Sequence, residues 1–148
     1  MPQNLGLLRR TLFEISLRAG NSALKAQKNT KTVKDTGGGA GITTQADLDA
    51  QETIRLGLAQ VFPDIPLVGE EDNQFQTCPE EAFIADPIDG SAPYKAGAPF
   101  FATTIGYLSP TAKEGIIYLP AMSKLYMTHN ADVLVYTCLL YTSPSPRD

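Results

Sequence analysis

Apolar residues recur at alternating steps of three and four positions near the start of the chain, which places them along one face of a helix. Asn4 precedes this stripe and is a suitable N-cap for that helix. A second run with helical spacing covers Gln45–Val61 and stops before Pro63, and Thr44 and Asp47 fit a capping box at its start. The pattern therefore predicts two helices. The first stripe consists of Leu5, Leu8, Leu12, Ile15, Ala19, Ala23 and Ala26.

Short apolar runs bounded by turn residues follow the second helix and indicate strands. Two of them, Ile65–Val68 and Ala82–Ala85, lead directly into acidic clusters. Because open α/β folds hold ligands at the ends of strands, we expect these clusters to lie together at one edge of a sheet. Helices and strands in this order predict one α/β domain. Further strand-like runs cover Phe100–Leu108, Glu114–Pro120, Lys124–Thr128 and Val133–Tyr136.

Residues 29–43 show neither pattern and include the glycine-rich run 37–41, so we expect a mobile loop there. The glycines lack the Gly-Lys-Ser/Thr continuation of a nucleotide P-loop. A loop that closes over a site, with Lys31 or Lys34 contacting phosphate, is the alternative interpretation.

The end of the chain departs from these patterns. Residues 137–148 read TCLLYTSPSPRD, have no periodicity and resemble a translated sequencing adaptor. We therefore assign residues 1–132 to the domain and expect 133–148 to be a non-native or disordered tail. A genuine disordered tail rich in serine and proline is the alternative.

Composition narrows the class of protein. A chain of 148 residues, 43% of them hydrophobic, is long enough for one domain with a core. It contains neither an apolar run long enough for a membrane helix nor a secretory signal, so we expect a cytoplasmic protein without a membrane partner. The two cysteines, Cys78 and Cys138, form neither a disulfide framework nor a zinc motif.

The net charge of −4 is unevenly distributed, because residues 1–34 carry +6 and residues 35–148 carry −10. The acidic part would repel a phosphate backbone, so we expect no nucleic-acid partner. A small phosphorylated substrate could still bind if metal ions reversed the local charge. For the basic N-terminal helix we favour a solvated face over a nucleic-acid patch, a membrane-surface helix or a transit peptide.

Carboxylates gather at the two strand ends, with Glu70 and Glu71 after the first strand and Asp86 and Asp89 after the second. Like charges this close together cost stability unless a cation lies between them. All the candidate ligands are oxygens, which select hard cations such as Mg²⁺, Mn²⁺ or Ca²⁺. The alternative is an acidic turn with a solvated Asp-Gly; the three-residue spacing does not fit an EF-hand loop.

The residues around these aspartates also suit a phosphate ligand. Ile88 offers a carbonyl between the two acids, Gly90 allows close backbone approach, and Ser91 supplies a hydroxyl. The N–H groups of Gly90 and Ser91 could begin a short helix over Ser91–Lys95 and bind phosphate there.

These motifs resemble the inositol monophosphatase family of metal-dependent, lithium-sensitive phosphatases. Gly69-Glu70-Glu71 followed by Asp86-Pro87-Ile88-Asp89-Gly90-Ser91 carries the likeness, which covers about residues 5–130. The resemblance implies a layered α-β-α-β-α sugar-phosphatase-like α/β fold, truncated here to its N-terminal α+β portion. Four further segments match in order: Thr43–Asp47 with Gln51, Phe62–Asp64 before the glutamates, and Ile105–Tyr107 and Gly115–Tyr118 after the aspartates.

The resemblance implies a set of metal ligands. Glu70, Asp86 and the carbonyl of Ile88 would bind a first metal, and Asp86 and Asp89 would share a second. The metals would be two or three Mg²⁺ ions, with Mn²⁺ as a possible replacement. Glu71 would support Glu70 without touching a metal.

The resemblance also implies how water and phosphate are held. Glu70 would face the attacking water, which the Ser91 hydroxyl would orient and activate. Asp47 would hydrogen-bond Ser91, a position where the family usually has Thr. Asp89, Gly90 and Ser91 would contact the phosphate.

The implied activity is hydrolysis of a small phosphate monoester, similar to an inositol monophosphate, by direct attack of a metal-activated water. Bisphosphate nucleotidases, fructose-bisphosphatases and a catalytically inactive metal-binding or interaction protein are the alternatives. The family is much longer and has a later Trp-Asp motif, whereas this chain has no Trp. We therefore expect a fragment of a homodimeric enzyme that, alone, is aggregation-prone and weakly active or inactive.

Overall fold

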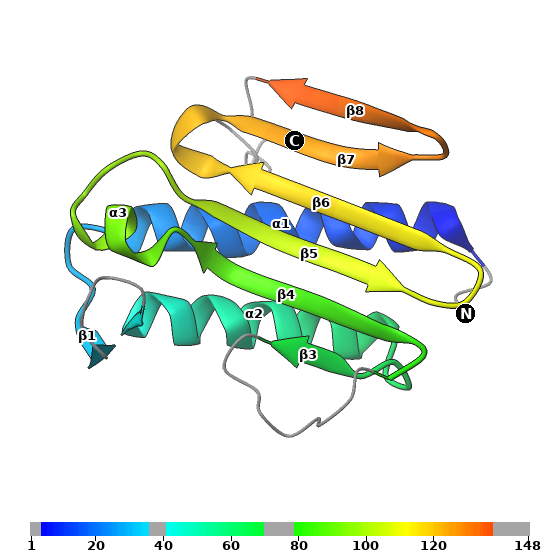
Figure 1. Ribbon diagram of the computed structural model, residues 1–148, viewed down its shortest axis with the longest axis horizontal. Coiled ribbons are helices and arrows are strands. Elements are labelled where there is room, and N and C mark those ends of the chain that lie inside the picture. The colour runs from blue at the N-terminus through cyan, green and yellow to red at the C-terminus, as the bar shows by residue number, and fades with distance from the viewer. Residues whose placement is uncertain (1–3, 36–40, 70–78, 138–148) are drawn as a thin grey trace, which may run out of the picture.

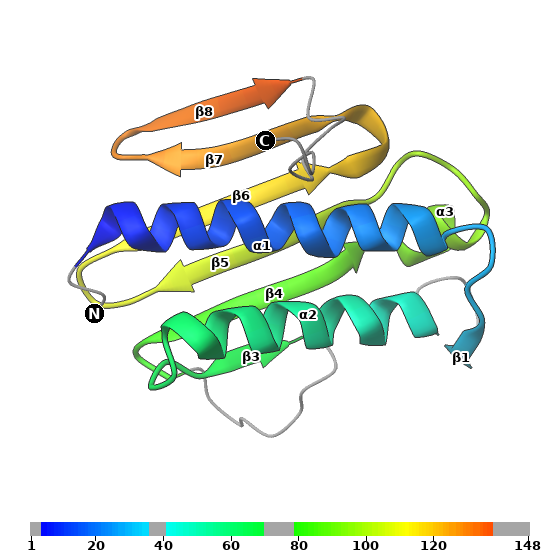
Figure 2. The same cartoon turned by 180° about the vertical axis from the view of Figure 1, so that it is seen from behind.

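The computed structural model describes residues 4–35, 41–69 and 79–137, which form a layer of helices on one face of a sheet (Figures 1 and 2). Helix α1 covers Leu5–Ala26 and helix α2 covers Gln45–Val61, which confirms both predicted helices. The predicted caps are also present, because Asn4 accepts from the N–H of Leu7, and Thr44 forms a capping box with Asp47 in the first turn of α2. Within the described ranges, no helix combines the length and apolarity that a membrane crossing needs.

The main sheet of the described residues has the strand order β3-β4-β5-β6-β7-β8 (Figure 1). Strand β3 runs parallel to β4, and the other neighbouring pairs are antiparallel. The parallel pair therefore ends at the same edge of the sheet. The strands are β3 (Leu67–Gly69), β4 (Ala82–Asp89), β5 (Ala102–Leu108), β6 (Lys113–Leu119), β7 (Lys124–His129) and β8 (Asp132–Thr137).

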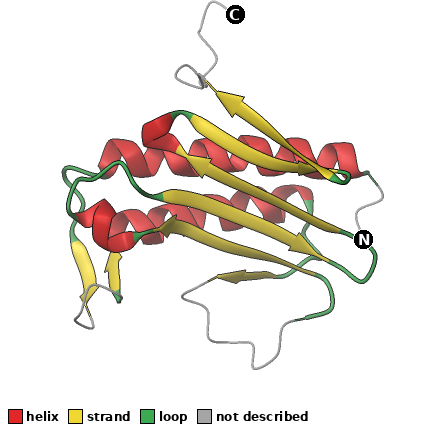
Figure 3. Cartoon of the chain, turned by 45° about the horizontal axis from the view of Figure 1, so that its top comes forward, coloured by secondary structure: helices red, strands yellow, loops and turns green. Residues whose placement is uncertain are grey.

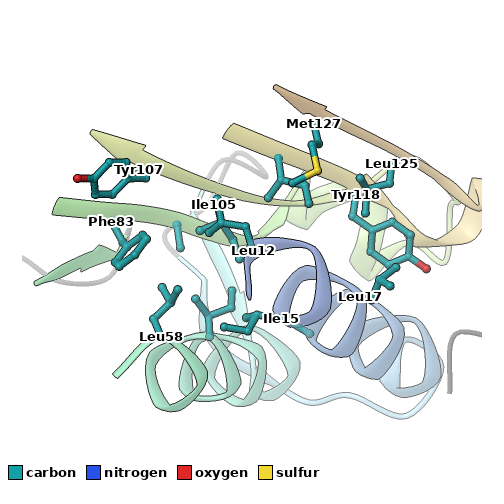
Figure 4. Packing of buried hydrophobic residues seen from close by; sticks show 14 of the residues in the cluster. Leu12, Ile15, Leu17, Leu58, Phe83, Ile105, Tyr107, Tyr118, Leu125 and Met127 are labelled. Carbon is teal, nitrogen blue, oxygen red and sulfur yellow. The ribbon is translucent and has the colours of Figure 1, made fainter. Parts of the chain in front are cut away.

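The hydrophobic core lies between the helices and one face of this sheet (Figure 4). The rings of Phe83 and Tyr107, from neighbouring strands, lie 5.5 Å apart between centroids. Gly20 lets α1 approach β6 closely, because a Cβ at this position would lie 2.5 Å from the ring of Tyr118. Helix α1 is therefore fixed against the sheet, and the elements that lead to the acidic clusters are anchored on a rigid support.

The opposite face of the sheet is covered by no helix of the described residues (Figures 1 and 2). It is hollowed by a cavity of about 710 Å³ that runs from the end of β3 across the sheet to β8. Ile84 and Ile117 line it and are 39% and 46% exposed. This is a large apolar surface of the kind that folded proteins usually cover.

The predicted loop over 29–43 is wrong in part, because two short antiparallel strands lie within and beside it (Figure 3). These strands are β1 (Thr32–Asp35) and β2 (Ile42–Thr44). All four residues of β1 are exposed, so no alternation of buried and exposed positions could signal a strand. Residues 36–40, which include most of the glycine-rich run, lie outside the described residues.

Several strand boundaries differ from the prediction by one or two residues, and two larger differences affect the acidic motif and the end of the domain. Strand β4 continues to Asp89 instead of ending at Ala85, so the acidic motif lies within a strand and not after it. Residues 132–137 form β8, paired along β7, because Val133–Tyr136 has the strand pattern noted in the sequence. Residues 133–137 are therefore ordered as a strand, whereas the expectation that the tail is non-native stays a prediction, and 138–148 lie outside the described residues.

Candidate active site

The end of β4 carries both aspartates of the motif. Asp86 pairs with Thr104 of β5 and Asp89 pairs with Ala102, so three steps along β4 oppose two steps along β5. The extra residue is a β-bulge. Residues three apart in a regular strand lie on opposite faces, whereas partners directly across a ladder share a face. The bulge therefore brings Asp86 and Asp89 to the same face of the sheet, the face without helices.

Pro87 and Ile88, the two residues between the aspartates, hold the bulge in place through contacts with neighbouring buried residues. Pro87 has no N–H that a regular ladder would require, and its carbonyl accepts a hydrogen bond of 2.8 Å from the hydroxyl of Thr103. Ile88 is 1% exposed and packs in a second cluster with Tyr94 and Phe101. These contacts leave little freedom for the aspartates on either side.

Gly90 turns the chain from β4 into a short helix, α3 (Ser91–Lys95), which confirms the predicted helix. Its φ of +94° is a left-handed conformation that favours glycine, and a Cβ there would lie 2.9 Å from the carbonyl oxygen of Phe100. The hydroxyl of Ser91 donates to the carbonyl of Ile88 at 3.2 Å. The Ser91 hydroxyl and a predicted metal-binding carbonyl are thus in direct contact.

Asp47 lies in the first turn of α2 and is only 6% exposed. Its Oδ2 atom accepts hydrogen bonds from the N–H of Thr44 at 2.8 Å and from the Thr44 hydroxyl at 2.7 Å. Burial, with a smaller contribution from the negative charge of Asp47, raises the pKa of Tyr94 in α3 to about 12. Asp47 is therefore close enough to α3 to act on it electrostatically, and its predicted hydrogen bond to Ser91 stays a prediction.

Glu70 and Glu71 lie outside the described residues. They follow Gly69, the last residue of β3, which pairs with Ala85, the residue before Asp86. Within the described residues, no three His, Cys, Asp or Glu side chains are close enough to hold a metal ion. The sequence predicts Glu70 as a further ligand for a metal centre at the end of β4, and that role stays a prediction.

The donor atoms at the end of β4 nevertheless fit a hard divalent cation. They are two carboxylates on one face and the carbonyl of Ile88, all of them oxygens. The Oδ1 atom of Asp86 is buried, so a cation bound beside it would be partly shielded from water and more strongly attracted than at the surface.

Sequence reasoning missed three residues that hold this region in place. Thr103 bonds the carbonyl of Pro87, whereas Tyr94 and Gln27 join α3 to the end of α1. Thr103 carries a signal in the sequence, because it is a polar residue among the core-facing positions of its strand. Tyr94 and Gln27 carry none, since their hydrogen bonds join positions 71 and 67 residues apart.

Comparison with known families decides what kind of protein this is. The profile of the inositol monophosphatase family matches residues 6–139. The chain belongs to the inositol monophosphatase family. The resemblance that the acidic motifs suggest is therefore confirmed over nearly the whole chain.

Two curated relatives in this family have different phosphatase names. A histidinol-phosphatase from Chlorobaculum parvum is 37% identical over 84 residues, which are 56% of this chain and 32% of that protein. A fructose-1,6-bisphosphatase/inositol-1-monophosphatase from Aquifex aeolicus is 31% identical over 116 residues, 76% of this chain and 44% of that protein. The chain thus spans less than half the length of each of these relatives.

A solved structure has the same fold. An IMPase/NADP phosphatase complexed with NADP and Ca²⁺ matches with a TM-score of 0.79 at 19% identity, and the match covers 91% of this chain and 53% of that one. The α/β fold expected from the sequence is therefore confirmed as an inositol monophosphatase fold, of which this chain matches about half.

Proposed function

We propose that this chain supplies the metal-binding part of a Mg²⁺-dependent phosphatase for small phosphate monoesters. The bulge in β4 carries the proposal, because it brings Asp86 and Asp89 to one face of the sheet, beside the end of β3. Membership of a phosphatase family supports the reaction class.

Asp86, Asp89 and the carbonyl of Ile88 would bind Mg²⁺ together with Glu70. When bound, Mg²⁺ or Mn²⁺ would neutralise the phosphate oxygens, lower the pKa of a water molecule and stabilise the leaving alkoxide. The Ca²⁺ in the IMPase/NADP phosphatase structure is likewise a hard cation that prefers oxygen ligands, which supports this choice of metal.

Ser91 and Asp47 would orient the attacking water. The Ser91 hydroxyl donates to the carbonyl of Ile88, so its oxygen can accept a hydrogen bond from a water beside the metal ligands. The buried carboxylate of Asp47, close to α3, would stabilise that orientation, and Glu70 would face the same water. The water would attack the phosphorus directly, the bond from phosphorus to the alcohol oxygen would break, and the leaving alkoxide would take up a proton, so that no phosphoryl group is transferred to the protein.

The substrate class follows from what the related proteins have in common. Their names describe phosphatases for histidinol phosphate, for fructose 1,6-bisphosphate and inositol 1-phosphate, and for NADP. All of these carry a phosphate on an alcohol oxygen. We therefore propose a phosphate monoester of a small polyol or amino alcohol, with an inositol monophosphate as the first to test.

Calorimetric titration tests this proposal with inositol 1-phosphate, histidinol phosphate and fructose 1,6-bisphosphate, each with and without Mg²⁺. Free inositol is the unphosphorylated control. We expect at least one ester to bind only with Mg²⁺, and Asp89→Asn to weaken that binding about tenfold or more, because it removes a charge from the metal site.

Asp64→Asn is the matched control, because it makes the same change at an exposed position just after α2 and should leave ester binding unchanged. The proposal is contradicted by ester binding that is independent of Mg²⁺, by ester binding that Asp89→Asn does not alter, and by the absence of ester binding.

A further inference from the structure

The residue that follows α1 is hydrogen-bonded to α3, the short helix that comes directly after β4. The side-chain amide nitrogen of Gln27 donates to the carbonyl of Tyr94 at 3.0 Å and to the carbonyl of Ala98 at 2.9 Å. Both partners are acceptors, so both N–H bonds of this nitrogen are used and the orientation of the amide group is fixed. Gln27 thus joins α1 to both α3 and the turn that follows it.

Tyr94 strengthens the same connection from the other side. Its hydroxyl donates to the carbonyl of Ala23 at 2.7 Å, and its side chain is fully buried. The backbone N–H of Gln27 bonds the carbonyl of Leu24 instead of Ala23, so the last turn of α1 leaves a carbonyl for α3 to satisfy. Helix α3 therefore supplies the donor for a carbonyl at the C-terminal end of α1, while Gln27 adds a second donor to the Tyr94 carbonyl, which also accepts from the N–H of Gly97.

Helix α3 depends on such contacts for its position. It has only five residues, and a helix this short has little stability of its own. The N–H of Tyr94 bonds the carbonyl of Gly90 at 2.9 Å, and the N–H of Ala98 bonds the carbonyl of Pro93 at 2.9 Å. The two carbonyls that Gln27 holds thus belong to residues that close the turn after Asp89.

We propose that Gln27 is a positioning residue that orders the turn carrying Asp89, Gly90 and Ser91. Its two hydrogen bonds hold α3 against the end of α1 and so fix Asp89 and the Ser91 hydroxyl relative to Asp86. The consequence for metal binding rests on the function proposed above, whereas the ordering of the turn stands on the geometry alone.

Amide hydrogen exchange tests the ordering directly. Gln27→Met keeps the length and volume of the side chain but removes both donors, and Gln27→Glu places acceptor oxygens opposite two carbonyl oxygens. In both variants we expect the amides of Tyr94, Ala96, Gly97 and Ala98 to exchange about tenfold faster or more, because two hydrogen bonds are lost. Amides in the centre of α2 should exchange as in the wild type, a selectivity that general destabilisation would not produce.

Gln60→Met is the control, because Gln60 is exposed in the last turn of α2 and the substitution is the same. A Mn²⁺ titration of the same proteins measures the consequence for the site. We expect Gln27→Met to weaken Mn²⁺ binding about threefold to tenfold and Gln60→Met to leave it unchanged.

The outcomes separate this inference from the proposed function. Unchanged exchange at residues 94–98 in Gln27→Met overturns the positioning role, whatever the metal does. If Gln27→Met speeds exchange but leaves Mn²⁺ affinity unchanged, Gln27 orders the turn without affecting metal binding. That result overturns the proposed link between Gln27 and the metal site. A wild-type chain that bound no Mn²⁺ would contradict the proposed metal centre, and the exchange rates alone would then decide the role of Gln27.

Discussion

Pro87 and Gly90 shape the end of β4 in complementary ways. Pro87 occupies the bulge, where a missing N–H costs no ladder hydrogen bond. Gly90 adopts a φ of +94° and starts α3 immediately after Asp89. Together they allow a strand to present two aspartates on one face and then to turn sharply.

Gly90→Ala should lower the free energy of unfolding by about 1–3 kcal/mol, because alanine is strained at positive φ and its Cβ would meet the Phe100 carbonyl. Urea unfolding followed by circular dichroism measures this loss. Gly115→Ala is the control, because that glycine is in a strand and a Cβ there meets nothing within 4 Å. Equal stability of the two variants would contradict the strain assigned to Gly90.

The sequence predicts the chemistry of the site better than its geometry. Asp86, Asp89 and Ser91 are recognisable from residue type and spacing alone, because carboxylates and a hydroxyl at strand ends suit a metal-phosphate site. Their common face is not recognisable, since it depends on a register shift between β4 and β5 that sequence spacing does not encode. Gln27 was missed because its partners are distant in sequence.

At the scale of whole elements, local signals decide what can be predicted. The helices α1 and α2 have strong periodicity and capping residues, so their bounds follow from the sequence. Strand β1 is exposed along its length and has no such signal. The sequence-based prediction ends β4 too early, at Ala85, because a proline within a strand is unusual outside edges and bulges. The bulge that accommodates Pro87 becomes visible only in the pairing of β4 with β5.

A partly buried ion pair joins Arg9 of α1 to Glu114 of β6. Arg9 donates to both carboxylate oxygens of Glu114, at 3.2 and 2.9 Å, and the hydroxyl of Thr128 donates to the same carboxylate at 2.7 Å. Burial alone would raise the pKa of Glu114, but these hydrogen bonds and the charge of Arg9 outweigh it and hold the pKa below its usual value of 4.5. The charged form is therefore stabilised by folding.

A depressed carboxylate pKa adds stability at neutral pH, and that stability is lost as the pH falls through the folded-state pKa. We expect the thermal midpoint of the wild type to decrease as the pH is lowered through the ordinary carboxyl pKa of 4.5 and below it. Glu114→Gln should lower the midpoint at pH 7 and flatten this pH dependence. Thermal unfolding at a series of pH values measures both effects.

Glu52→Gln is the control for this prediction. Glu52 pairs with Arg55 on α2, but both side chains are 53% exposed, and exposed pairs contribute little to stability. If Glu114→Gln retained the full acid sensitivity of the wild type, the role assigned to the Arg9–Glu114 pair would be wrong.

At the scale of the whole molecule, the sheet is covered on one face only by the described residues (Figure 2). Its other face exposes apolar side chains around the 710 Å³ hollow. The related proteins are about twice as long as the matched segment, so much of their length has no counterpart here. The expected homodimer of a longer protein remains a prediction.

An uncovered apolar face favours self-association. We expect the chain to sediment as concentration-dependent oligomers and to bind a hydrophobic dye, and Ile117→Thr to reduce both effects, because Ile117 is 46% exposed within the hollow. Val33→Thr makes a similar change on β1, outside this face, and should have little effect. A wild-type chain that remained monomeric at all concentrations and bound no dye would contradict this expectation.

The central claim is that Asp86 and Asp89 bind one metal centre together. A Mn²⁺ titration of the wild type, Asp86→Asn, Asp89→Asn and the double variant tests it as a double-mutant cycle. We predict that each single change weakens Mn²⁺ binding about tenfold or more, and that the double change weakens it by clearly less than the product of the two, because both side chains serve the same site. Absence of Mn²⁺ binding by the wild type, or losses that simply multiply, would contradict the account.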